Sequence, residues 1–248
     1  MNSSLNPDII EYRKLFPVPS NNILPSSLLI DEKTIQYITT PRYTKKIKQI
    51  LSYHPVLNKP NNAITIVDAT GGAGGDTISF ANTYHKVISI ENDAERFALL
   101  NNNINAYELT NVHTINGNCL DVIPNLDQID ILYMDPPWGG KNYKLETSIR
   151  LGFVDSTNTQ VYLENFIINC FDANKMKCVP NLIVLKLPLN YNIKILFDTL
   201  NPLNPEPGIG MVEHIDTNTH TNTNLPMQYN IYMYKLEKFL IMIIIKNN

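Results

Sequence analysis

Short apolar runs and helical patterns alternate along the chain, and this alternation is typical of an α/β fold. The apolar runs, rich in Ile and Val, predict buried strands at residues 63–67, 86–90, 112–115, 129–134 and 182–187. Apolar residues at helical spacing predict helices at residues 7–16, 41–53, 94–107, 160–173 and 193–200. Thr40 followed by Pro41 is typical of a helix start. These elements predict a doubly wound sheet of mostly parallel strands.

The C-terminal strands and the domain boundary follow from the same pattern. Residues 228–236 and 239–245 predict an antiparallel hairpin that closes the sheet, while residues 211–215 compete for the place of the sixth strand. Both assignments stay open. We expect residues 1–60 to form a small helical extension covering the active site and residues 61–248 to form the main domain.

Composition narrows the classes of function. The 248 residues are 44% hydrophobic and 17% charged, which supports a sizeable core. A net charge of −3 and a pI of about 5.9 exclude a protein that grips long nucleic acids through a basic surface. Basic residues gather in two segments, where they are either solvated faces or contacts for a few phosphates. These residues are Arg42, Lys45, Lys46, Lys48, Lys141, Lys144 and Arg150.

The cysteines indicate the compartment. Cys119, Cys170 and Cys178 have no C-x-x-C spacing, and no histidine joins them in a ligand pattern, so we expect no metal. An odd number of cysteines without a signal peptide favours a reducing compartment, either cytoplasmic or nuclear. The longest apolar run, residues 239–245, is too short to cross a bilayer. We therefore expect a monomer without a membrane partner.

A glycine-dense turn follows the first predicted strand. Residues 68–76 read Asp-Ala-Thr-Gly-Gly-Ala-Gly-Gly-Asp and lead into a helical pattern, which is typical of a nucleotide cradle. The next strand ends in Glu91, where a carboxylate can accept both hydroxyls of a ribose or simply cap a helix. Asp68 is placed to take the cationic end of a ligand. These features fit S-adenosylmethionine better than NAD, because no pyrophosphate needs neutralising.

A second motif follows the strand at residues 129–134. Residues 135–140 read Asp-Pro-Pro-Trp-Gly-Gly, in which two prolines fix the backbone and remove two N–H donors. Such a turn presents a carboxylate and a flat ring at one point. It suits a planar base amine that stacks on Trp138 and donates to Asp135 or to the Pro136 carbonyl. The other interpretation is an ordinary proline-rich turn around a buried Trp.

Taken together, these motifs resemble those of the trimethylguanosine synthase family. The matching residues are the 68–75 turn, the acid of Glu91, the 136–140 element with Tyr143, and the Leu-Pro-x-Asn turn at 187–190. The resemblance covers roughly residues 30–190. It implies a Rossmann-like class I methyltransferase whose seven-stranded, mostly parallel sheet has an antiparallel last strand. It also implies methyl transfer from S-adenosylmethionine to guanine N2 of a 7-methylguanosine RNA cap, leaving S-adenosylhomocysteine.

The resemblance carries site roles to matching positions of this chain. Catalysis is implied for Asp135, Pro136 and Trp138. Contacts to the cofactor are implied for Thr40, Asp68, Thr70, Gly71, Gly72, Gly74, Glu91, Asn92, Asn118, Cys119 and Asp135. Contacts to the capped RNA or cap dinucleotide are implied for Tyr37, Trp138, Gly139, Lys141, Tyr143, Lys186 and Asn190. No metal is implied.

Several positions depart from the family pattern. Asp135 stands where the family usually has Ser, and Lys141 where it has a small residue or Pro. Leu189 replaces an Arg, so one expected phosphate contact is missing. Asn118 stands where an acid usually meets the adenine amine, and its side-chain carbonyl can accept the same hydrogen bond.

Other functions stay open. The Asp-Pro-Pro-Trp tetrad is also similar to adenine-N6 methyltransferases, so activity on internal adenine or on ribosomal guanine N2 is the alternative. A third hypothesis is a cap-binding module without enzymatic activity. The short chain suits a viral member of the family.

Overall fold

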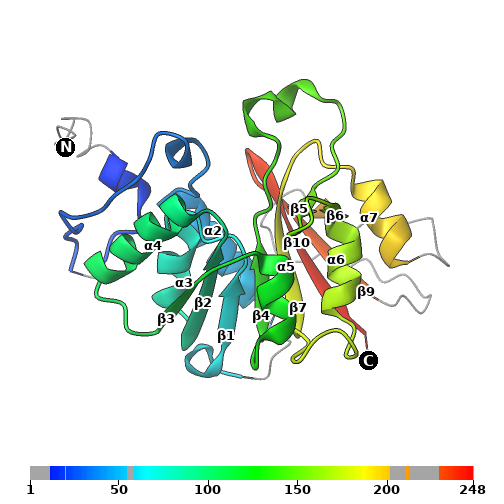
Figure 1. Ribbon diagram of the computed structural model, residues 1–248, viewed down its shortest axis with the longest axis horizontal. Helices are drawn as coiled ribbons and strands as arrows, with labels where there is room; N and C mark the ends of the chain where they lie inside the picture. The colour runs from blue at the N-terminus through cyan, green and yellow to red at the C-terminus, as the bar shows by residue number, and fades with distance from the viewer. Residues whose placement is uncertain (1–11, 20, 55–58, 202–210, 213–228, 248) are drawn as a thin grey trace. The chain divides into compact units, whose positions relative to one another are not determined.

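The computed structural model describes residues 12–19, 21–54, 59–201, 211–212 and 229–247. The chain divides into two compact units, Met1–Gly117 and Asn118–Asn248. In Figure 1 the first unit runs from blue to green and the second from green to red.

The first unit is built on three parallel strands in the order β3-β2-β1. Its strands are β1 (Thr65–Asp68), β2 (Lys86–Glu91) and β3 (Val112–Asn116). Its helices are α2 (Pro41–Ser52), α3 (Gly75–Ala81) and α4 (Ala94–Ala106), with 3₁₀ turns η1 (Arg13–Leu15), η2 (Thr34–Gln36) and η3 (Asn61–Ala63). The β1 residues and all but the first residue of β2 are buried, which explains their continuous apolar runs.

The N-terminal segment is packed onto α4. Phe16 and Leu28 share a buried cluster with Leu100 and Ile104 of that helix. The buried Asn103 side chain accepts from Leu29 N at 2.8 Å, and it donates to the carbonyls of Leu29 and Ala73 at 2.8 Å each. One amide thus ties the segment, the helix and the glycine turn together within this unit.

The second unit contains the strand order β4-β7-β10-β9-β8. Its strands are β4 (Ile131–Met134), β7 (Leu182–Pro188), β8 (Met211–Val212), β9 (Tyr229–Lys235) and β10 (Phe239–Lys246), with a separate hairpin of β5 (Gly152–Val154) and β6 (Gln160–Tyr162). Its helices are α5 (Cys119–Val122), α6 (Leu163–Cys170) and α7 (Ile193–Leu200), with 3₁₀ turns η4 (Ile123–Asn125) and η5 (Gly140–Leu145). Strands β4 and β7 are parallel, and β10 is antiparallel to both β7 and β9.

Most of the predicted elements are confirmed, including the closing hairpin, which forms as β9 and β10. The strand competition is resolved: β9 is the long strand, and residues 211–212 add a short parallel strand beside it. The helix predicted at 160–173 was wrong at both ends, since residues 160–162 pair with β5 and α6 spans only residues 163–170. Part of the helix predicted at 7–16 lies outside the described residues.

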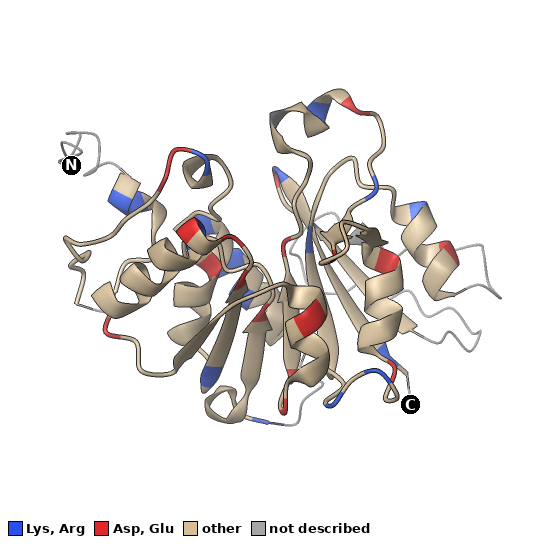
Figure 2. Cartoon of the chain, viewed as in Figure 1, with Lys and Arg blue, Asp and Glu red and all other residues tan. Residues whose placement is uncertain are grey.

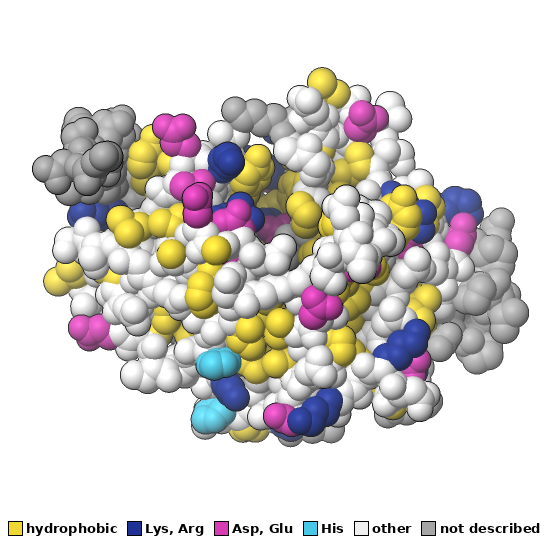
Figure 3. All heavy atoms as spheres, viewed as in Figure 1, with side chains coloured by type: hydrophobic (Ala, Val, Ile, Leu, Met, Phe, Trp, Pro, Cys, Tyr) yellow, Lys and Arg dark blue, Asp and Glu magenta, His cyan; other side chains and the backbone are white. Residues whose placement is uncertain are grey.

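Charge and hydrophobicity are mixed over the surface. Figure 2 shows acidic and basic residues interspersed along the chain in each unit, and the face in Figure 3 carries apolar, polar and charged side chains next to one another. Among the described residues, no helix has the length and apolar character needed to cross a membrane.

Candidate cofactor and substrate sites

The glycine turn joins β1 to α3. Gly72 and Gly74 have φ angles of +55° and +99°, which L-residues with side chains rarely adopt. Gly71 N donates to Ile90 O at 2.8 Å, which fixes the turn against the end of β2. A Cβ added at Gly72 would meet no atom within 4 Å, so the turn is open at this point. The turn has the exposed backbone that close approach of a ligand requires.

Glu91 braces this turn from the end of β2. Its carboxylate, in a side chain 8% exposed, accepts from Gly72 N at 2.9 Å and from Asp93 N at 2.8 Å. Arg96 Nη2 donates to the same carboxylate at 3.2 Å. Asn92 is exposed next to it. The acid predicted for a ribose therefore lies at the turn and already has three protein donors.

Asp68 lies beneath the turn with only 1% of its surface exposed. Its carboxylate accepts from Thr77 Oγ1 at 2.6 Å and from Thr70 N at 3.2 Å, and Thr77 Oγ1 lies 2.8 Å from Ser89 Oγ. These contacts give Asp68 a structural role in holding the turn. The predicted contact with the cationic end of a ligand stays a prediction.

The segment before α2 crosses the start of α3. Thr39 Oγ1 donates to Asp76 Oδ2 at 2.6 Å, and a Cβ on Gly75 would lie 2.7 Å from Ile38. Gly75 is therefore needed for this close packing. Tyr37 is 54% exposed, and Thr40 begins α2 without a side-chain cap. Sequence reasoning missed the Thr39–Asp76 pair, because no spacing links residues 37 positions apart.

In the second unit, Asn118 is the N-cap of α5. Its side-chain oxygen accepts from Leu120 N at 3.1 Å, and its amide donates to Val154 O of β5 at 2.7 Å. Cys119 is buried behind it. The predicted role of Asn118, accepting from an adenine amine, would use the second lone pair of the same oxygen.

The Asp-Pro-Pro-Trp turn begins directly after β4. Asp135 Oδ2 lies 2.5 Å from Lys186 Nζ, and the two side chains are 20% and 4% exposed. The sheet explains this pair: Met134 is opposite Leu185 in parallel register, so the next positions on the two strands are Asp135 and Lys186. Pro136 is buried and Pro137 is exposed. The turn of residues 135–138, which we call the ledge, therefore carries a negatively charged hydrogen-bond acceptor, Asp135. Its counter-ion, Lys186, is buried.

Trp138 is partly buried, and its indole lies near two aromatic rings and the ammonium of Lys186. Its ring centroid lies 5.2 Å from that of Tyr143, edge on, and 6.5 Å from that of Phe239. Lys186 Nζ lies 5.4 Å from the Trp138 centroid, and Trp138 Nε1 is buried without a hydrogen-bond partner. Burial raises the pKa of Tyr143, which Asp135 also raises and Lys186 lowers. The chain thus brings four predicted residues of the second unit together: Asp135, Trp138, Tyr143 and Lys186.

The loop after Trp138 is held by Asn190. Gly139 and Gly140 have φ angles of +91° and +74°, and η5 follows with Lys141 in it. The Asn190 amide donates to Tyr143 O at 2.7 Å and to Glu146 O at 2.8 Å. Asn190, predicted as a cap contact, shapes the loop that carries the other predicted contacts.

Two of the basic residues considered as phosphate contacts instead form contacts within the protein. Arg150 is paired with the buried Glu164 and lies 3.5 Å from the centroid of the Tyr162 ring. Lys48 donates to Ser79 O at 3.2 Å, and burial lowers its pKa. Lys144 is exposed, so it is better placed for a phosphate.

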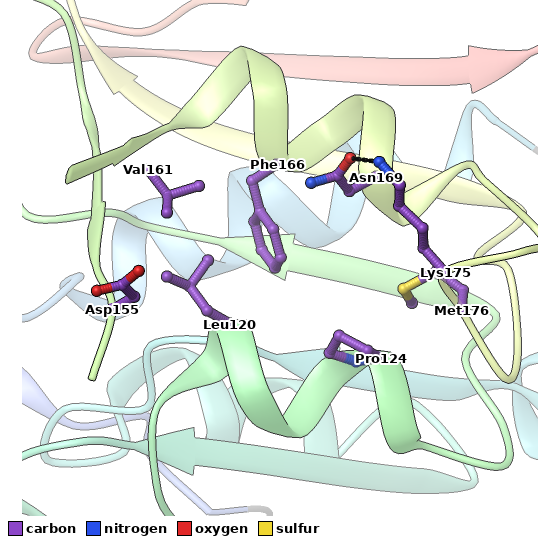
Figure 4. A pocket seen from close by; sticks show the side chains of 8 residues that line it. All are labelled: Leu120, Pro124, Asp155, Val161, Phe166, Asn169, Lys175 and Met176. Atoms are coloured by element: carbon purple, nitrogen blue, oxygen red, sulfur yellow. Dashed lines mark hydrogen bonds between the residues drawn. The ribbon is translucent and has the colours of Figure 1, made fainter. Parts of the chain in front are cut away.

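A cavity of about 280 Å³ in the second unit is lined by other residues. Figure 4 shows Phe166 of α6 and Leu120 of α5 facing into it, with the Asn169–Lys175 hydrogen bond of 2.6 Å at its rim. None of the predicted site residues lines it. Among the described residues there is also no group of three or more His, Cys, Asp or Glu side chains suited to a metal.

The parallel strands, the glycine turn after β1, the acid ending β2 and the proline turn after β4 define a Rossmann-like class I S-adenosylmethionine-dependent methyltransferase. A solved structure with this fold, the precorrin-6y C5,15-methyltransferase of Geobacter metallireducens, superposes with a TM-score of 0.53 at 12% identity. The match covers 94% of this chain and 100% of that one. Residues 63–234 match the RNA cap guanine-N2 methyltransferases, and the chain belongs to this family.

Two relatives agree with this assignment. The uncharacterized protein L320 of Acanthamoeba polyphaga mimivirus is 31% identical over 213 residues, which are 78% of this chain and 80% of that protein. Trimethylguanosine synthase of Schizosaccharomyces pombe is 32% identical over 127 residues, which are 45% of this chain and 53% of that protein. The mimivirus relative supports the expectation of a viral member.

Proposed function

We propose that this methyltransferase transfers a methyl group from S-adenosylmethionine to the exocyclic N2 of the 7-methylguanosine cap of RNA. The products would be 2,7-dimethylguanosine caps and, if N2 is methylated twice, 2,2,7-trimethylguanosine caps. The observation that carries the proposal is the turn after β4 in the second unit, where the ammonium of Lys186 lies near both the Asp135 carboxylate and the Trp138 indole. The family match supports the guanine N2 target.

The first unit supplies the groups proposed to hold the cofactor. The open backbone at Gly72 fits a ligand that approaches the turn closely, and Glu91 lies beside it for a ribose hydroxyl. When bound, S-adenosylmethionine supplies a methyl on a sulfonium sulfur, so the reaction is an in-line displacement by the amine nitrogen.

The residues of the ledge are proposed to place that nitrogen. The N2 lone pair is delocalised into the guanine ring, so rate depends on holding N2 about 3–3.5 Å from the methyl carbon. Asp135 and the Pro136 carbonyl would accept the amine protons as positive charge develops on nitrogen. No strong general base is needed, because the methylated ammonium is acidic.

Trp138 is proposed to select the methylated cap. A guanine methylated at N7 is cationic, and stacking on indole adds about 0.5–2 kcal/mol of cation–π attraction. This is roughly one power of ten in affinity. We therefore expect 7-methyl-GTP to be a better substrate than GTP, and equal turnover of the two would remove this role.

The test offers labelled S-adenosylmethionine to 7-methyl-GTP, capped RNA, uncapped RNA and DNA. We expect transfer to the first two only. Transfer to an adenine in RNA or DNA, or to uncapped ribosomal guanine, would replace the proposal with the alternative that the Asp-Pro-Pro-Trp tetrad favours.

A variant test examines Asp135 itself. Asp135→Ala should remove most of the rate while leaving S-adenosylhomocysteine affinity nearly unchanged, as read by calorimetry. Asp198→Ala is the matched control, since that carboxylate pairs with Lys194 on the surface. Equal loss of rate and cofactor affinity in Asp135→Ala would contradict the assigned role.

A further inference from the structure

Lys186 is an unusual residue for the interior of a strand. It lies in β7, every residue of which is buried, and its own side chain is 4% exposed. Burying an ammonium is costly unless it is paired and hydrogen-bonded. The position therefore needs a compensating partner, and the chain supplies several.

The ammonium of Lys186 contacts the Asp-Pro-Pro-Trp turn and the Phe239 ring of β10. Lys186 Nζ lies 2.5 Å from Asp135 Oδ2. It also lies 5.4 Å from the Trp138 ring centroid and 5.2 Å from that of Phe239. A charge-assisted hydrogen bond of this length fixes the carboxylate and stabilises its ionised form. The geometry thus joins Lys186 to the catalytic acid.

We propose that Lys186 is a positioning residue that acts through Asp135, holding its carboxylate aimed at the amine, instead of a contact to the cap phosphates. The proposal rests on the proposed function and deepens it. Phosphate contacts need an exposed cation, and exposed Lys144 of η5 meets that need better.

The charge of Lys186 has a second consequence. Together Asp135 and Lys186 are neutral beside the indole on which a cationic base would stack. Replacing Lys186 with a neutral side chain leaves the negative carboxylate there, and this attracts a cation. Positioning through Asp135 therefore predicts a lower kcat with an unchanged or lower KM, whereas a phosphate contact predicts a higher KM.

The test compares Lys186→Met with the double variant Asp135→Asn/Lys186→Met. For Lys186→Met we expect kcat to fall on the order of ten- to a hundredfold, the range that misplacing a reacting group costs. The KM for 7-methyl-GTP should not rise. Since Lys186 acts through Asp135, the double variant should lose no more than about threefold in kcat beyond the single variant Asp135→Asn, which is measured alongside it. Lys194→Met, which breaks an exposed pair with Asp198, is the matched control and should keep wild-type kinetics.

Two results would overturn the proposal. One is a tenfold rise of KM in Lys186→Met, as for a lost phosphate contact. The slope of log affinity against log salt concentration would then also be smaller in magnitude by about one. The other is a further tenfold loss of kcat when Lys186→Met is added to Asp135→Asn, which would mean that the two residues act independently. Lys186→Arg, which keeps the charge, should recover part of kcat, and equal defects in Arg and Met variants would also oppose the proposal.

Folding and substrate are checked separately. The double variant removes both charges of the pair, so its thermal unfolding should be closer to wild type than that of Lys186→Met. Unchanged S-adenosylhomocysteine binding shows that the cofactor unit is intact. If the substrate panel shows that adenine is methylated instead of guanine N2, the proposed function fails, and the same kcat comparison on the adenine substrate still decides the role of Lys186.

Discussion

Substitution of Gly71 by Ala is expected to disrupt the interior of the first unit. The added Cβ would lie 2.3 Å from Ser89 Oγ and 3.0 Å from Leu100 Cδ2. Ser89 is fully buried, and its hydroxyl lies 2.8 Å from Thr77 Oγ1, which in turn donates to Asp68. The methyl group therefore collides with a buried chain of hydroxyls and a carboxylate that supports the turn.

The magnitude follows from two effects. Overpacking a buried site costs about 1–3 kcal/mol, and losing the hydroxyl contact costs about 1 kcal/mol more. Together these give about 2–4 kcal/mol, which for a chain of this size lowers Tm by about 4–16 °C. Gly72→Ala is the matched control, because its Cβ meets no atom within 4 Å and only its φ of +55° is strained. That strain costs about 1–2 kcal/mol.

A double variant separates the collision from general damage. With Ser89→Ala the nearest obstacle is removed, and the Leu100 side chain at 3.0 Å is free to shift. Gly71→Ala should then cost less than about 1 kcal/mol in the Ser89→Ala background, measured by urea unfolding of all four proteins. Additive costs for the two substitutions would refute the argument that the hydroxyl is what the methyl group meets.

Three further results are expected. Asn103→Leu removes four hydrogen bonds at a buried amide and should lower the free energy of unfolding, measured in urea, by about 2–4 kcal/mol. A loss under about 0.5 kcal/mol would contradict the role of Asn103 as an anchor. Asn190→Ala should raise the KM for capped RNA by about tenfold (roughly 1.4 kcal/mol), because two loop carbonyls lose their donor. An unchanged KM would contradict the role of Asn190 in holding this loop. Asp93→Ala should cost about 1 kcal/mol near neutral pH, because Asp93 caps α4. Backbone hydrogen bonding from Arg96 lowers the Asp93 pKa, so this difference should start to shrink near the ordinary carboxyl pKa and vanish as pH falls through the lowered pKa of the folded state, and a pH-independent difference would argue against the charge.

The sequence predicted the fold where one face of a helix, or most of a strand, is apolar. The strands β1, β2 and β7 are rich in Ile, Val and Leu and are buried at all but the first residue of β2, and α7 begins and ends at the predicted residues 193 and 200. The β5–β6 hairpin was missed because strands of three residues carry too little periodicity to be told from a helix start. The helix predicted from residue 160 therefore began too early.

The candidate site was predictable only in part, for a related reason. An acid at the end of an apolar strand can be recognised from sequence, so Asp68, Glu91 and Asp135 were named as candidates, and their roles toward a ligand stay predictions. Their partners were not, because those partners lie far along the chain. Lys186 is 51 positions from Asp135, and only the register of β4 with β7 brings them together.

Counting donors at Glu91 sharpens what this acid can do for a ligand. A carboxylate has about four acceptor positions. Gly72 N, Asp93 N and Arg96 Nη2 occupy three of them, so about one remains for a ribose hydroxyl. The sequence predicted that Glu91 would accept both hydroxyls, and this requires one donor to leave. Arg96 is the donor best able to do so, because its side chain is 38% exposed whereas the two backbone amides are fixed by the turn and by the start of α4. Two fixed backbone amides thus orient the Glu91 carboxylate. Arg96 also donates to it and is the partner that a ligand hydroxyl could replace.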